Sequence, residues 1–103
     1  MESTEKTAQK LTDLIEFLPE KFASKVFFRE ENVSIILFAL LKNQEIAAHK
    51  TPRDAHLQCL LGEAVVTIGG IENVLKKGEI IHLPKNILHV IKALKKTKLM
   101  LIK

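Results

Sequence analysis

From Ala23 onward, the sequence is a succession of short apolar runs separated by turn signals, and this pattern constrains the fold more than any other feature. Gly69-Gly70 is a two-residue hairpin signal, and Lys77-Gly78 and Pro84-Lys85-Asn86 mark further turns. The clearest runs are residues 33–41, 64–68, 71–75, 79–83, 87–94 and 99–102. About eight to ten short strands at this spacing, with no second helix, predict an all-β antiparallel sandwich or barrel.

The first 22 residues follow a different pattern. Residues 1–10 are polar, and we expect them to be flexible. Five apolar residues then recur at the spacing of one helical face: Leu11, Leu14, Ile15, Leu18 and Phe22. Asp13 followed by Glu16 is similar to a capping box, and Pro19 ends the pattern, so we expect a short helix or turn. No shift in composition marks a boundary after it, and residues 11–103 are predicted to form one domain.

The run Val33–Leu41 is apolar at both its odd and its even positions. Successive side chains of a strand point to opposite faces of the sheet, so both faces of this strand must be covered. The strand is either central and covered twice, or its outer face meets another subunit. We favour the second explanation, which predicts a homodimer.

The composition excludes two classes of protein. The longest apolar stretch, Ile35–Leu41, is far shorter than the roughly 20 residues of a membrane-spanning helix. No secretory signal is visible at the N-terminus. The single cysteine, Cys59, cannot form an intrachain disulfide and is expected to be a small core residue. We therefore expect a cytoplasmic protein with no membrane partner.

The charge is unevenly distributed along the chain. Residues 1–75 hold 8 Lys/Arg against 11 Asp/Glu, whereas residues 76–103 hold 8 Lys against the single Glu79. A nucleic-acid site usually combines clustered charge with aromatic platforms or arginines. No aromatic residue other than histidine follows Phe38, and no arginine follows Arg53. We therefore expect no nucleic-acid partner, and the lysines are interpreted as solubilising groups on turns and strand edges.

Two spaced motifs lie within residues 43–93. The first has the order Asn43, five residues, His49-Lys50-Thr51, three residues, Ala55, six residues, Gly62. After fifteen intervening residues, the second has the order Gly78, five residues, Pro84-Lys85-Asn86, two residues, His89, three residues, Ala93. This arrangement resembles the small single-domain cupins, whose corresponding positions are Gly, His, His, Glu and Gly in the first motif and Gly, Pro, Gly, His and Asn in the second. The resemblance implies an antiparallel jelly-roll barrel. Asn43 and Asn86 stand where the family has glycine, and asparagine is the next best residue for a left-handed backbone.

The resemblance also implies a metal site, but only part of it is present. His49 and His89 match two of the family's usual ligands, whereas Thr51 and Ala55 replace a His and the Glu. A hydroxyl is a poor ligand for a divalent ion and alanine is none. Possible third ligands are His56, His82 or Asp54. Strand alternation turns His56 away from the cavity if Ala55 faces it.

These considerations lead to one functional hypothesis and one alternative. The first is a protein that binds a small molecule in a barrel cavity lined by Thr51 and Ala55, with a divalent metal (Zn, Mn, Fe or Ni) held weakly by His49 and His89. The alternative is a metal-dependent enzyme of the isomerase or oxygenase type that uses a three-His site. The sequence assigns no catalytic residue.

Overall fold

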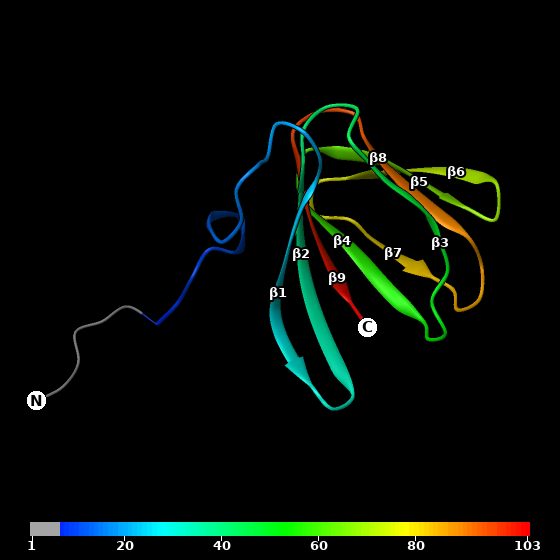
Figure 1. Cartoon of the computed structure of the whole chain (residues 1–103), viewed down its shortest axis with the longest axis horizontal. Helices are drawn as coiled ribbons and strands as arrows, with labels where there is room; N and C mark the ends of the chain where they lie inside the picture. The colour runs from blue at the N-terminus through cyan, green and yellow to red at the C-terminus, as the bar shows by residue number, and fades with distance from the viewer. Residues whose placement is uncertain (1–6) are drawn as a thin grey trace, which may run out of the picture.

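The computed structural model describes residues 7–103, and most of these residues lie in nine β-strands (Figure 1). One turn of 3-10 helix, η1 (Leu11–Asp13), precedes them. The strands are β1 (Ala23–Glu30), β2 (Val33–Leu40), β3 (Glu45–His49), β4 (Ala55–Leu61), β5 (Glu63–Ile68), β6 (Ile71–Lys76), β7 (Ile80–Leu83), β8 (His89–Ala93) and β9 (Thr97–Ile102). The all-β expectation with a short N-terminal turn is therefore confirmed.

The strands form two antiparallel sheets. One has the order β1-β2-β9-β4-β7 and the other β3-β8-β5-β6, so strands far apart in the sequence are neighbours in space (Figure 1). Along β4, Ala55, Leu57 and Cys59 point inward, and the buried thiol of Cys59 lies among core side chains, as expected. The core between the sheets consists of Leu40, Ile46, Ala55, Leu57, Cys59, Ala64, Val66, Leu75, Leu83, Ile91, Ala93, Leu99 and Leu101.

Four turn residues have the left-handed backbone that the motifs require. Asn43 and Asn86 have φ values of 72° and 62°, and Gly62 and Gly78 have values of 86° and 88°. Gly62 is also tightly packed, because a Cβ atom there would overlap the carbonyl oxygen of Lys96. The two asparagines therefore replace glycine in the expected conformation, which they tolerate better than other residues with a side chain.

The N-terminal segment forms less helix than its periodicity predicts. Among residues 7–22 only η1 is helical, and it ends at Asp13, where the capping-box pattern suggested a beginning. Phe22 packs on the core between the sheets and Leu18 is exposed. Other apolar residues pack on the outer face of the first sheet, because that face offers a larger apolar surface than a short isolated helix does. Leu14, Ile15 and Phe17 cover Leu37, Ala39, Leu60 and Met100. Of the segment 1–10 expected to be flexible, residues 1–6 lie outside the described part of the chain, and residues 7–10 are exposed.

The position of β2 in the first sheet explains why both of its faces are apolar. It lies between β1 and β9, with Phe38 and Leu40 directed to the core and Leu37 and Ala39 directed to the N-terminal segment. The N-terminal segment of the same chain therefore covers Leu37 and Ala39, which explains why these outward-facing residues are apolar. Val33, near the start of the strand, stays exposed, and the homodimer stays a prediction. No helix within residues 7–103 is long and apolar enough to cross a membrane.

Candidate functional site

Strands β3 and β8 bring the two matched histidines together. Ile46 pairs with Ile91, the register then shifts, and His49 pairs with His89. The two ring centroids lie 4.2 Å apart, with the rings edge to face at 73°. The sequence spacing predicted that both histidines belong to the same barrel. They become direct neighbours because the register of β3 against β8 shifts between Ile46 and His49.

His89 is buried without a hydrogen-bond partner. Its exposed fraction is 2%, and neither Nδ1 nor Nε2 has a partner among residues 7–103. Burial, with a contribution from the neighbouring His49, lowers the pKa of His89 below its ordinary value, so the ring is neutral at pH 7. A neutral imidazole has one donor and one acceptor nitrogen, and here both are unused.

His49 connects this buried ring to the surface. The side chain is half-buried, and its Nδ1 lies 3.0 Å from the carbonyl oxygen of Ala47. The Nδ1–H tautomer donates to that oxygen, which leaves Nε2 as an acceptor. The pair thus combines an accessible ring with a desolvated one.

The residues at the two lost ligand positions have other roles. Thr51 donates its hydroxyl to the carbonyl oxygen of Arg53 at 2.7 Å. Ala55 is 1% exposed and belongs to the core, so it lines no open cavity. Thr51 does line a pocket, which is described below.

The three further candidates lie together, but on the outer face of the first sheet. His56 and His82 are register partners on β4 and β7, and their rings stack with centroids 5.1 Å apart. The Oδ1 atom of Asp54 lies 3.2 Å from His82 Nε2 and accepts the backbone N–H of Lys85 at 3.0 Å. Both hydrogen bonds lower the pKa of Asp54, and the bond from the Lys85 backbone has the larger effect. Because Ala55 and Leu57 point inward, His56 points away from the barrel interior.

The donor set does not fit the metal site that the resemblance implies. No three His, Cys, Asp or Glu side chains within residues 7–103 are grouped so as to hold a metal ion. His49 and His89 supply two imidazoles, whereas catalytic and structural zinc sites use three or four protein ligands. We therefore derive no chemical step through a metal.

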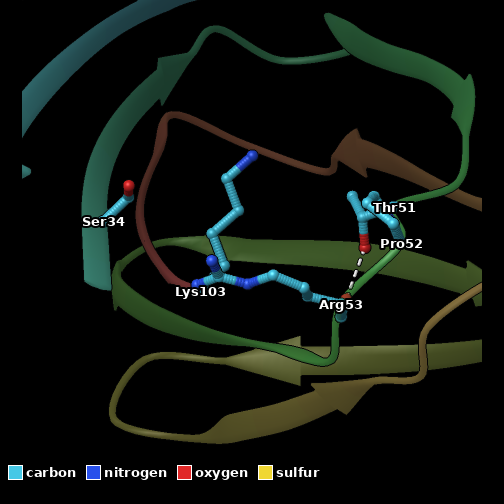
Figure 2. Close-up of a pocket in the computed structure, with 5 residues that line it drawn as sticks. All are labelled: Ser34, Thr51, Pro52, Arg53 and Lys103. Atoms are coloured by element: carbon cyan, nitrogen blue, oxygen red, sulfur yellow. Dashed lines mark hydrogen bonds between the residues drawn. The ribbon is translucent and has the colours of Figure 1, made fainter. Parts of the chain in front are cut away.

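A pocket of about 140 Å³ opens at the same end of the barrel as the histidine pair. It is lined by Ser34, Thr51, Pro52, Arg53 and Lys103 (Figure 2). Thr51 lies two residues after His49, and its carbonyl oxygen accepts the N–H of Asn86, three residues before His89. Sequence reasoning missed Ser34, Arg53 and Lys103, because they come from three distant segments and no spacing connects them.

Solved structures identify the architecture, although no model of a known protein family matches the sequence and no curated protein matches it. A conserved protein of unknown function from Streptococcus pyogenes gives a TM-score of 0.85 at 26% identity, covering 99% of this chain and 88% of its own. A cupin superfamily protein from Desulfitobacterium hafniense gives a TM-score of 0.89 at 22% identity, covering 96% of this chain and 91% of its own. The chain has the cupin fold.

A third solved structure shows the same domain inside a longer protein. It is a cupin 2 conserved barrel domain protein from Leptotrichia buccalis, which is 29% identical with a TM-score of 0.83. The match covers 88% of this chain and 44% of that chain. Within this fold, the present chain has left-handed backbone at the motif turns and histidines at positions 49 and 89, and it has Thr51 and Ala55 at the other two ligand positions.

Proposed function

We propose that this cupin binds a small molecule at the barrel end where His49 and His89 meet. The observation that carries this proposal is the buried imidazole of His89, whose two nitrogens have no partner among the described residues. Leaving a buried polar group without a partner costs about 1–3 kcal/mol. A ligand that supplies a donor and an acceptor removes this cost, which is a source of both affinity and selectivity.

The histidine pair suggests how the ligand engages. The ring of His49 lies edge to face against His89 and is half-exposed. In the proposed binding event, His49 turns aside and the ligand's polar group replaces it at the buried ring. The barrel core is mostly aliphatic, so the remainder of the ligand is expected to be apolar and compact.

A divalent metal is not required for this binding. His49 and His89 offer two nitrogens, and a weakly held Zn, Mn, Fe or Ni ion would depend on water or on the ligand for its other positions. The alternative enzyme of isomerase or oxygenase type needs a third histidine. His56 and His82, the two that the sequence offered, lie on the outer face of β4 and β7, and no observation favours that enzyme.

The test is a ligand screen read out at the histidines. Small aliphatic acids, alcohols and amides are added to the protein, and the imidazole signals of His49 and His89 are followed by NMR. Ligands that shift both signals and raise Tm support the proposal, provided that His89→Met abolishes the effect. The matched control, His56→Gln, removes an exposed histidine and is expected to bind normally.

Two results contradict the proposal. One is a ligand set that stabilises the protein and its His89→Met variant equally. The other is a screen in which no compound shifts either histidine signal. In a separate experiment, the untagged protein is incubated with Zn, Mn, Fe or Ni, and its total metal content is measured. One tightly held ion per chain contradicts the metal-free form of the proposal.

A further inference from the structure

The pocket beside Thr51 gathers two cationic side chains and hydroxyl groups at the mouth of the barrel (Figure 2). Arg53 and Lys103 supply the positive charge, and Ser34 and Thr51 supply the hydroxyls. We infer that this pocket binds a small oxyanion, the phosphate or carboxylate group of a ligand. The inference does not rest on the histidine pair, since none of the five lining residues is a histidine.

The fold holds the backbone of Lys103 and the guanidinium of Arg53 in place. Lys103 continues the pairing of β9 with β2, because its N–H donates to the carbonyl oxygen of Ser34 at 2.9 Å and its carbonyl oxygen accepts the N–H of Ser34. The Nη2 atom of Arg53 donates to the carbonyl oxygen of Asn32 at 3.0 Å. Figure 2 shows the Arg53 side chain extended across the pocket and the Lys103 side chain directed toward the space beside Ser34.

The two cations are not neutralised by a neighbouring side chain. Residues 7–103 form two ion pairs, His82–Asp54 and Lys95–Glu63, and neither includes Arg53 or Lys103. Asp54, the acid next to Arg53 in the chain, is held by His82 and by the N–H of Lys85. A further arginine is close by, because Arg29 is the register partner of Ser34 and lies on the same face of the sheet.

The donor set and the size of the pocket point to an oxyanion. A guanidinium has five N–H donors, of which one is used by Asn32, and an ammonium has three. Ser34 adds a hydroxyl, whereas Thr51 already donates its own to Arg53. The volume of about 140 Å³ is smaller than the ~300–1,000 Å³ of drug-sized sites. It suits one phosphate or carboxylate group, because oxygens of both groups accept the paired N–H donors of arginine.

The other positively charged part of the molecule lacks this arrangement. The exposed lysines of residues 76–103 are distributed over different turns and strands: Lys76, Lys77, Lys85, Lys92, Lys95 and Lys96. None of them lines the pocket. Charge alone therefore does not distinguish the pocket. Its distinguishing feature is that Arg53 and Lys103 line one partly open hollow.

The experiment is a titration at constant ionic strength, because screening would otherwise imitate weak binding. Inorganic phosphate, methyl phosphate, acetate and malonate are added separately, and binding is followed by calorimetry and by NMR of the backbone N–H groups of residues 34, 51–53 and 103. We expect saturable binding with a Kd of about 1 mM or tighter for at least one anion. A response to both phosphates indicates a phosphorylated ligand, and a response to acetate or malonate indicates a carboxylate.

Variants test whether the anion binds in this pocket. Arg53→Gln is expected to weaken binding at least about tenfold, since it removes a charge-assisted hydrogen-bonding group, and Arg53→Lys is expected to recover only part of the loss. Lys50→Gln removes a charge from the same loop without touching the pocket and serves as the matched control.

Two results overturn the inference. The first is the absence of saturable binding for all four anions. The second is an equal loss for Lys50→Gln and Arg53→Gln, which indicates diffuse electrostatic attraction.

Discussion

The ammonium of Lys98 lies 5.0 Å from the ring centroid of Phe17, over the outer face of the first sheet. The same ammonium donates to the carbonyl oxygen of Thr12, and the residue is only 9% exposed. Lys98, on β9, thus holds the N-terminal segment against Leu37 and Ala39 on the outer face of the sheet. This contact, and not a second subunit, covers that part of β2.

Lys98→Ala is expected to destabilise the protein by about 2 kcal/mol, because it removes a charge-assisted hydrogen bond and a cation–π contact. Urea denaturation measures the loss, and faster proteolysis after residue 10 locates it in the N-terminal segment. Lys96 also lies near the Phe17 ring, at 5.9 Å, but it is exposed. Lys96→Ala is expected to cost less than about 0.5 kcal/mol, and equal losses in both variants contradict the assignment.

The stability of the protein is expected to fall as the pH falls below about 6.5, the ordinary pKa of histidine. The pKa of His89 is lowered in the folded state, so the unfolded chain binds more protons at acidic pH. The loss begins near the unfolded pKa and levels off below the folded one. Urea unfolding at about pH 7.5 and about pH 5.5 measures the difference.

Two variants test whether His89 causes this pH dependence. His89→Met is expected to reduce it and to leave stability at neutral pH unchanged or higher, because two unpaired buried nitrogens are removed. His56→Gln keeps His89 and is expected to retain the slope. An unchanged slope in His89→Met shows that other groups cause the acid sensitivity.

Gly62→Ala and Gly78→Ala separate backbone strain from steric overlap. Both glycines have positive φ values, but an added Cβ at Gly62 meets Lys96 and Thr97, whereas nothing lies within 4 Å at Gly78. We expect Gly78→Ala to cost about 1–2 kcal/mol from strain alone. Gly62→Ala is expected to cost at least about 3 kcal/mol or to prevent folding. Similar thermal stabilities for the two variants contradict this account.

The asparagines at the left-handed turns are expected to tolerate glycine better than alanine. Asn43→Gly and Asn86→Gly relieve the backbone strain but increase the entropy of the unfolded chain, so we expect changes within about 0.5 kcal/mol. The corresponding alanine variants are expected to cost about 1 kcal/mol. Differential scanning calorimetry of the four variants checks the order, and alanine variants as stable as the glycine ones refute it.

The predicted homodimer has a direct test in solution. Val33 on β2 and Ile80 on β7 are exposed on the outer face of the first sheet. Light scattering is expected to give the mass of two chains, and Val33→Lys is expected to favour the monomer by placing a charge in the contact. Val74→Lys, an exposed site on β6 of the other sheet, is the control. A monomer at every concentration rejects the prediction.

Several features were predictable because they depend on local sequence. Turn residues and alternation of apolar side chains placed most strand boundaries within one or two residues, and the motif spacing placed left-handed backbone at Asn43 and Asn86. The same alternation turned His56 away from the interior once Ala55 was buried. These properties follow from backbone sterics and from the two-residue period of a strand, which neighbouring residues determine by themselves.

Other features required the tertiary structure. The stacking of His56 on His82, the exclusion of water from His89 and the pocket around Arg53 join residues from separate strands and loops. The apolar spacing of residues 11–22 predicted a helix, yet most of this segment lies without helix across the sheet. The sequence by itself determined the strands, the turns and the loss of two ligands at Thr51 and Ala55. Strand register and the packing of distant segments decided which polar groups were left without partners, because those interactions depend on residues far apart in the chain.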